Sequence, residues 1–318
     1  MILFDINPGW LGYISHSPYL NLWRSAEGDR DCILLPEGWR GPPKNLNLTA
    51  IVTDSCMRAD WPKEAIKVRL WDDIHQYSYA HHLGACTAQA SYDMALSAYR
   101  FSALPTDLLH LDETKRDAMV IFPHSVPDDP PLPQREDAAG TFVLGSGGGA
   151  RAYPFLHAVK AIGLPGITWV SHPGYGNKMA EDQAKWFPTL SQFRVGIVGL
   201  GWGRGGYVLA KYLEYPYAGL LLLAERPSER DCEVLGVRDG ENCFLFDWPK
   251  DKDRFTTILS ESLQDPFPFS EIAAAGQQLA LSRHRASLRL GYLKRLIAYY
   301  QEHRCVPSVE KQVELFQA

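Results

Sequence analysis

The chain has 318 residues, of which 46% are hydrophobic, 12% aromatic and 22% charged. This length favours two domains over one, and the ordinary composition excludes disordered and fibrous classes. The formal net charge of −5 argues against a protein that binds nucleic-acid backbones over a broad face.

The longest apolar runs, such as Ala218–Ala224, are too short to cross a bilayer, and the first residues lack the pattern of a signal peptide. The six cysteines include no CxxC pair and no spacing typical of metal ligands. We therefore expect a cytoplasmic protein with reduced thiols, no bound metal and no membrane span.

Short apolar runs alternate with helical patterns in the first part of the chain. The sequence predicts strands at Met1–Ile6, Cys32–Leu35, Ala50–Thr53, Ile66–Leu70 and Ala118–Phe122. The alanine-rich segment Tyr79–Tyr99 predicts a helix. Strands that alternate with helices are typical of a parallel sheet covered on both faces.

A proline-rich and acidic segment follows, and residues 127–140 are the predicted linker because prolines interrupt both helices and strands. The alternation then restarts. Further strands are predicted at Thr141–Leu144, Ile167–Val170, Arg194–Val198 and Leu220–Ala224. Helices are predicted at Pro154–Ile162, Phe255–Leu263, most of Phe269–His303, and Ser308–Phe316. We expect two α/β domains at residues 1–126 and 141–302, with residues 303–318 crossing back to the first.

A glycine-rich turn follows the predicted strand Arg194–Val198. Gly201, Gly203 and Gly206 satisfy the GxGxxG pattern, and Glu225 lies 19 residues further on, at the end of the next strand. This pattern is the fingerprint of a dinucleotide site, in which the acid binds a ribose. It favours an NAD(P)-dependent oxidoreductase, and a tight turn with no ligand is the simpler alternative.

Two features count against the dinucleotide interpretation. Pro216 leaves a helix of only about two turns after the glycines, with its predicted start at Tyr207. The chain beyond Pro227 is predicted to form a turn and a strand, without the crossover helix that a dinucleotide-binding half requires.

The stretch from Lys211 to Tyr300 offers a second interpretation. It contains, in order, the segment KYLEYPYAG at Lys211–Gly219, the turn GVRDGENC at Gly236–Cys243, and the pairs Asp265-Pro266 and Arg283-His284 with Ile272–Gly276 between them. This order resembles the C-terminal domain of GT-B glycosyltransferases, and most closely the CgeB-like group. The resemblance implies an α/β fold of two Rossmann-like domains facing a cleft, a nucleotide-diphosphate sugar such as a UDP-sugar as donor, and no cofactor.

The resemblance and the residue chemistry together give a candidate donor site. The diphosphate would contact Arg204, Lys211 and the backbone of Gly205, Gly206 and Tyr207 at a helix N-terminus. Glu214 would accept hydrogen bonds from the ribose, and His172 or Tyr175 would stack on the base. Gly145, Ser146 and Arg151 would form the opposite wall. Each of these groups also has a plain alternative as a turn or a solvated side chain.

The acceptor side would need a general base if the enzyme inverts. The candidates are His16, which follows the first strand, and Asp73 and His75, which follow the strand Ile66–Leu70. The acids could equally cap the next helix. Gly206 stands where the resemblance would place the first glutamate of an E-x7-E pattern, so retention and inversion both stay open. A glycan, a protein, a small molecule or a nucleic-acid base could be the acceptor, and an inactive sugar-nucleotide-binding protein is a further alternative.

Overall fold

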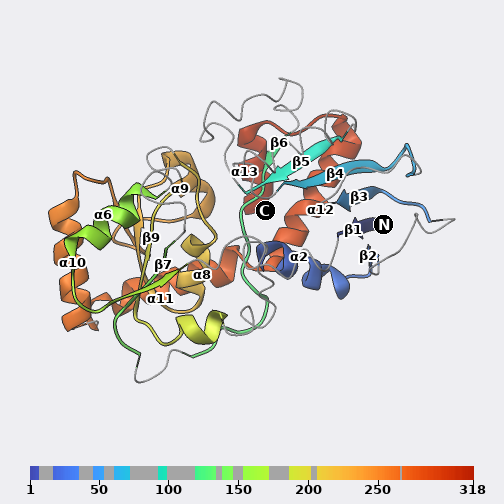
Figure 1. The fold of residues 1–318 in the computed structure, drawn as a ribbon. Helices are drawn as coiled ribbons and strands as arrows, with labels where there is room; N and C mark the ends of the chain where they lie inside the picture. Colours follow the sequence, from blue (N-terminus) through green and yellow to red (C-terminus); the bar gives the residue numbers. More distant parts are fainter. Residues whose placement is uncertain are drawn as a thin grey trace. The chain divides into compact units, whose positions relative to one another are not determined.

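The computed structural model describes residues 1–6, 17–35, 46–53, 61–71, 92–98, 119–133, 138–145, 153–171, 186–201, 206–265 and 267–318. The chain divides into two compact units. The first consists of Met1–Gly12, Tyr19–Pro123 and Ala286–Ala318, and the second of Tyr13–Pro18 and His124–Arg285. Each unit contains its own parallel sheet, and Figure 1 labels β1 to β6 of the first sheet and β7 and β9 of the second.

The first unit is built on a six-stranded sheet in the order β2-β1-β3-β4-β5-β6, with every neighbouring pair parallel. Its strands are β1 Ile2–Asp5, β2 Cys32–Leu34, β3 Ala50–Thr53, β4 Ile66–Trp71, β5 Met94–Ser97 and β6 Met119–Ile121. The helix α2 (Ser17–Glu27) joins β1 to β2. Leu3 and Ile51 are fully buried in one core cluster with Trp61, so apolar strand residues provide the core as predicted.

Two helices from the C-terminal part of the chain complete this unit, α12 (Ala286–His303) and α13 (Val309–Gln317). The hydroxyl of Tyr292 in α12 donates to the carbonyl of Ile121 over 3.2 Å, and the amide of Ile121 donates to Gln312 Oε1 in α13 over 3.0 Å. The chain therefore returns to the first unit at Ala286, before the predicted return at residue 303. The buried face of α12, which includes Leu293 and Leu296, accounts for the difference.

The second unit is built on a five-stranded parallel sheet in the order β11-β10-β9-β7-β8. Its strands are β7 Thr141–Gly145, β8 Ile167–Ser171, β9 Val195–Val198, β10 Leu221–Glu225 and β11 Phe244–Phe246. Its helices are α6 Pro154–Ile162, α8 Lys211–Tyr217, α9 Glu229–Leu235, α10 Lys252–Gln264 and α11 Ser270–Arg283, with the 3-10 turn η4 Phe267–Phe269.

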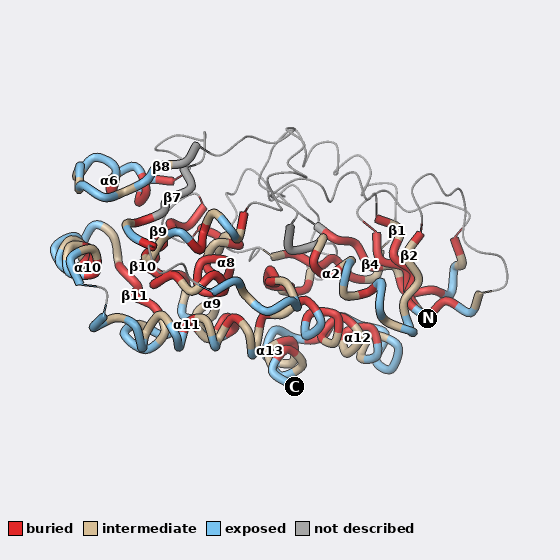
Figure 2. Tube along the Cα trace, turned by 90° about the horizontal axis from the view of Figure 1, so that it is seen from below, coloured by how far each residue is buried: buried red, intermediate tan, exposed pale blue. Residues whose placement is uncertain are grey.

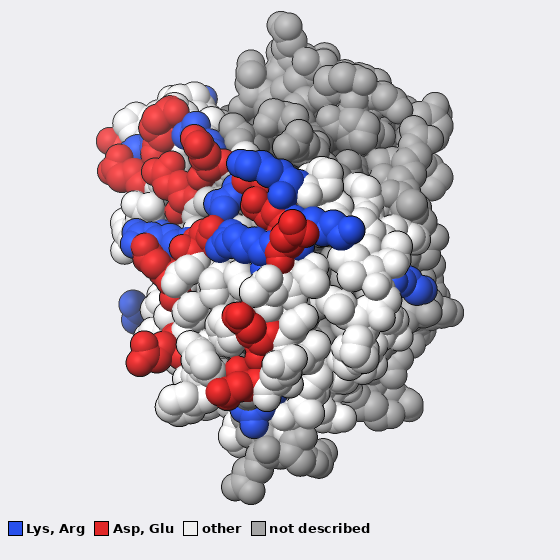
Figure 3. All heavy atoms as spheres, turned by 90° about the vertical axis from the view of Figure 1, so that its left-hand side faces the viewer, with Lys and Arg blue, Asp and Glu red and all other residues white. Residues whose placement is uncertain are grey.

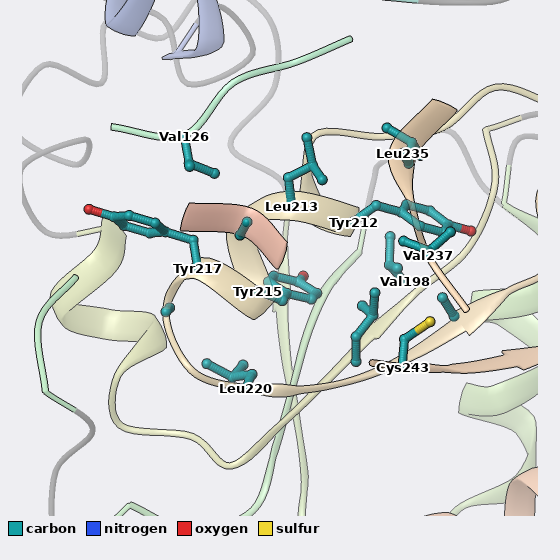
Figure 4. Close-up of a cluster of buried hydrophobic side chains, with 14 of the residues drawn as sticks. Val126, Val198, Tyr212, Leu213, Tyr215, Tyr217, Leu220, Leu235, Val237 and Cys243 are labelled. Carbon is teal, nitrogen blue, oxygen red and sulfur yellow. The ribbon is translucent and has the colours of Figure 1, made fainter. Parts of the chain in front are cut away.

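Side chains alternate between the two faces of the sheet along each strand, and β10 is buried on both faces. Leu221 and Leu223 of β10 pack into a cluster with residues of α6 and α10, whereas Leu222 and Ala224 pack into a cluster with residues of α8. Figure 4 shows the second cluster, in which tyrosines of α8 lie above the sheet. In Figure 2 the strands β9, β10 and β11 are buried, whereas α10 and α11 carry exposed residues.

Three predicted elements differ from the structure. Met94–Ser97 forms strand β5 and not the end of a helix, because its four residues are buried between β4 and β6. The helix predicted from Tyr207 begins at Lys211. The crossover helix expected to be absent is present as α9, whose N-cap Ser228 accepts a hydrogen bond from the amide of Asp231.

Candidate functional site

The topology of the second sheet places a candidate site at the carboxyl ends of β7 and β9. These strands are neighbours, yet the chain leaves β7 for β8 on one side and leaves β9 for β10 on the other. Ligands of open α/β sheets bind outside such a point, where the two connections diverge. Gly145 is the last residue of β7, and Gly199 follows β9 directly. The two glycine-rich segments predicted from the sequence thus leave adjacent strands.

The turn after β9 is closed at its base by backbone hydrogen bonds. The amide of Gly201 donates to the carbonyl of Tyr207 over 3.1 Å, and the amide of Tyr207 donates to the carbonyl of Gly201 over 3.2 Å. The buried ring of Tyr207 packs on Gly201 so closely that a Cβ there would overlap it. Gly201 is therefore required for packing, and the Tyr207 amide already has an acceptor.

Glu225, the last residue of β10, fixes the start of the same turn. Its Oε2 accepts a hydrogen bond of 2.9 Å from the amide of Leu200, and both residues are buried. The hydroxyl of Tyr212 donates to the backbone carbonyl of Glu225. Burial, and next the charge of Glu225, raise the pKa of Tyr212 well above its ordinary value, so this phenol stays a donor.

The helix α8 carries the two side chains that the sequence analysis assigned to the diphosphate and the ribose. Lys211 is its first residue and is partly exposed, and Glu214 lies one turn further and is 3% exposed. The predicted helix N-terminus at Tyr207 is wrong, because Tyr207 pairs with Gly201 and the helix starts four residues later. Gly206, which is buried, therefore precedes the helix without belonging to its first turn.

A charged network lies at the carboxyl ends of β10 and β11 and was not predicted. Asp239 accepts hydrogen bonds from Arg226 (2.9 Å) and from Arg254 (2.7 Å), and Arg226 also pairs with Asp247 at 3.2 Å. Burial raises the pKa of Asp239, but the bonds from Arg254, from the Leu245 amide and from Arg226 outweigh it, so the net pKa is lowered. Both arginines are thus already paired with acids of this network.

The turn Gly236–Cys243, which carries part of the resemblance, has a structural explanation. Asn242 Oδ1 accepts from the amide of Arg238 over 2.8 Å, and Asn242 Nδ2 donates to the carbonyl of Gly236 over 2.9 Å. Gly236 itself ends α9 in the left-handed region, at φ 74°. These residues shape the turn between α9 and β11.

Several predicted site residues lie outside the described residues. They are the acceptor-side residues His16, Asp73 and His75, and the donor-side residues Ser146, Arg151, His172, Tyr175, Gly203, Arg204 and Gly205. Of the predicted site, the structure brings together the ends of β7 and β9, Gly201, Gly206, Tyr207, α8 and Glu225 in the second unit.

The described part of the chain holds no group of three or more His, Cys, Asp or Glu side chains that could bind a metal ion. None of its helices combines the length and the apolar character needed to cross a membrane. On the face shown in Figure 3, basic and acidic side chains lie among one another.

Neither the known family models nor the curated proteins contain a match to this chain. Solved structures do. The chain resembles the crystal structure of Anabaena Alr3699/HepE in complex with UDP and glucose, with a TM-score of 0.57, 12% identity, and coverage of 93% of this chain and 99% of that one. The crystal structure of the same protein with UDP-glucose matches with a TM-score of 0.54, 11% identity, and coverage of 95% and 98%. This full-length likeness confirms the predicted fold class, α/β with the two Rossmann-like sheets of the GT-B fold.

Proposed function

We propose that this chain is a glycosyltransferase of the CgeB-like group that transfers a sugar from a nucleotide-diphosphate sugar to an acceptor hydroxyl. One observation carries the proposal. The segment with Lys211 and Glu214 directly follows the glycine-rich turn at the diverging strands β7 and β9, in a fold that matches a UDP-bound protein along its whole length. A nucleotide at this position would meet a cation and a carboxylate one helical turn apart.

The donor would be held by the second unit. Lys211 and Arg204 would neutralise the negative charge that develops on the diphosphate as the sugar leaves. Glu214 would accept hydrogen bonds from the ribose hydroxyls, with His172 or Tyr175 against the base. Because the amide of Tyr207 is bonded within the turn, we assign the phosphate contacts to the basic side chains and to α8, which begins at Lys211.

The acceptor would be activated by the first unit if the reaction inverts. A base among Asp73, His16 and His75 would take the proton from the acceptor hydroxyl as its oxygen bonds to the anomeric carbon. The bond between that carbon and the diphosphate oxygen breaks in the same step, and the nucleoside diphosphate leaves with the electron pair. A retaining reaction would instead place the new bond on the face that the diphosphate leaves.

The NAD(P)-dependent oxidoreductase retains two supporting observations. The carboxylate of Glu225 lies at the glycine-rich turn, and α9 supplies a crossover helix. Against it, the Leu200 amide already binds Oε2 of that carboxylate, and α8 has only seven residues. An inactive sugar-nucleotide-binding protein is the third possibility.

Two measurements separate these functions. Titrations with UDP, GDP and NADH, followed by thermal unfolding, identify the nucleotide, because a ligand at a hundred times its Kd stabilises the native state by about 2.7 kcal/mol. Donor hydrolysis with a panel of UDP- and GDP-sugars then distinguishes an enzyme from an inactive binder. Binding of NADH without binding of either diphosphate would overturn the proposal.

A further inference from the structure

A cavity lies in the second unit at the amino ends of β9 and β10, whereas the candidate donor site lies at the carboxyl ends of β7 and β9. Its volume is about 300 Å³, and its walls include Val195 and Leu221, the first residues of β9 and β10. The glycine-rich turn follows the other end of β9, so about 13 Å of strand separates the two places at 3.3 Å per residue. A ligand in this cavity would not occupy the donor site.

Besides the two strands, α11 and the proline-rich segment contribute walls of this cavity. One stripe of α11 contributes Ser270, Ala273, Ala274 and Gln277, whose spacing puts them on a single helix face. The proline-rich segment contributes Leu132 between two prolines. It is held in place near the cavity, because the hydroxyl of Tyr217 donates to the carbonyl of Asp129 over 2.8 Å.

The cavity combines apolar walls with one cation. Leu132, Phe269 and Leu221 provide hydrophobic surface, and Arg194 carries the one charge among the described wall residues. Arg194 Nε is anchored by a 2.8 Å hydrogen bond to the carbonyl of Ala138, and its two Nη groups bond to none of the residues that the structure describes. This hydrogen bond fixes the position of the guanidinium, and the N–H groups of its Nη atoms can donate to a ligand.

Gln277 supplies a second polar group. Its Nε2 donates to the carbonyl of Tyr217 over 3.1 Å, and this bond orients the side-chain amide at the cavity wall. Small-molecule sites have this construction, apolar walls with a few convergent polar groups, at volumes from roughly 300 Å³ upward. Arg194 supplies the charge among these described wall residues, and a guanidinium pairs well with an anion.

We propose that this cavity binds a carboxylate with an aliphatic chain, its head group on Arg194 and its chain between Leu132, Phe269 and Ala273. The guanidinium would bind both carboxylate oxygens, and the chain would remove the apolar walls from water. This site is separate from the donor site and does not depend on the function proposed above.

The test uses the whole chain and a series of straight-chain carboxylates from butyrate to decanoate, with octanol as the uncharged control. Binding is measured by titration calorimetry and by saturation-transfer NMR. We expect affinity to rise up to about fourfold per added CH₂ until the cavity is full. Octanol should bind at least about tenfold more weakly than octanoate, since it cannot pair with Arg194.

Variants of the wall residues test whether octanoate binds in this cavity. Arg194→Gln should lower the affinity for octanoate by about tenfold or more, and Arg194→Lys should lower it by less. Ala274→Phe should abolish binding by filling the cavity. Ala275→Phe, one residue along α11, and Arg238→Gln, whose side chain is 70% exposed, should bind as the unchanged protein does. Thermal unfolding of each variant shows that it is folded.

Three results would overturn the proposal. They are no binding of any carboxylate at millimolar concentration, equal binding of octanol and octanoate, and unchanged binding by both Arg194→Gln and Ala274→Phe. Displacement of octanoate by UDP would be a fourth, because it would place the carboxylate at the carboxyl ends of the strands.

Discussion

The carboxylate of Glu225 accepts a hydrogen bond of 2.9 Å from the backbone amide of Leu200, and both groups are buried. This bond links the end of β10 to the turn that follows β9. A charged acceptor on a buried amide is a strong interaction, because the amide has no water to replace it. The position of the glycine-rich turn thus depends on an acid 25 residues away in the sequence.

Removing this acceptor should destabilise the second unit. We expect Glu225→Ala to lower the free energy of unfolding by about 1–3 kcal/mol, because the Leu200 amide loses its buried partner. Glu225→Gln keeps an acceptor oxygen and should cost less. Urea denaturation followed by tryptophan fluorescence measures both. Glu233→Ala, at an exposed position of α9, is the matched control, and an equal loss in all three variants would contradict the role of the bond.

The packing of Tyr207 on Gly201 should make any side chain at position 201 destabilising. A methyl group in Gly201→Ala would overlap the ring, and such overpacking costs about 1–3 kcal/mol. Tyr207→Leu in the same chain should recover part of this loss by removing the ring. A double-mutant cycle in urea tests the coupling. If the two losses simply add, the ring contact is not the reason for the glycine.

Glu214 tests the proposed donor site. We expect Glu214→Ala to weaken UDP binding by about 1–3 kcal/mol through the loss of a charged acceptor for the ribose hydroxyls. Because Glu214 is buried, thermal unfolding must be measured beside calorimetric titration. Lower thermal stability with unchanged UDP affinity would assign Glu214 to the core alone. Glu261→Ala on α10 is the control.

The acceptor side gives a kinetic prediction. If the enzyme inverts, at least one of Asp73→Asn, His16→Ala and His75→Ala should lower turnover by about 10²–10⁴-fold, the usual contribution of a general base. Donor affinity should stay nearly unchanged in that variant. Near-normal turnover of all three with the true acceptor would exclude a base among them and favour a retaining reaction.

The first unit should lose stability in acid through Asp29. Lys294 Nζ donates to both carboxylate oxygens of Asp29, at 2.7 and 2.8 Å, and this bond lowers the pKa of Asp29. A lowered folded-state pKa stabilises the protein above the ordinary aspartate pKa of about 3.9, and the stabilisation disappears as the pH falls through the folded value.

Thermal unfolding between pH 6 and pH 2 tests this. At pH 6 the Tm of Asp29→Asn should lie below the Tm of the unchanged protein, and the two Tm values should converge as the pH falls below 4. Asp253 lies at an exposed position of α10, so the Tm of Asp253→Asn should follow the Tm of the unchanged protein at every pH. A constant difference for Asp29→Asn would show that the carboxylate acts by something other than its charge.

Buried elements were predictable because apolar runs and the helix stop signals are local. Ala50–Thr53 and Pro154–Ile162 agree with β3 and α6 residue for residue, the latter with Pro154 at its start and Gly163 beyond its end. The elements that differed depend on distant partners. Met94–Ser97 is a strand because β4 and β6 flank it, and an alanine-rich segment does not reveal its neighbours.

The same reason limits the prediction of the site. Lys211 and Glu214 were selected because their segment resembles one in known glycosyltransferases, and their contact with a donor remains a prediction. The bond between Glu225 and Leu200 could not be predicted, since the pattern that singled out this acid assigned it to a ribose. The helix start was misplaced at Tyr207 because pairing with Gly201 is invisible in the sequence.

The amide of Ile121 donates to the side chain of Gln312 across 191 residues. This bond can form only after Gln312 has been synthesised. A ribosome that has translated His124–Arg285 has supplied nearly all of the second unit, while β6 still lacks the helices that cover it. Domains generally fold as units during synthesis. The unit whose strands are made first is therefore completed last, when α12 and α13 have been synthesised.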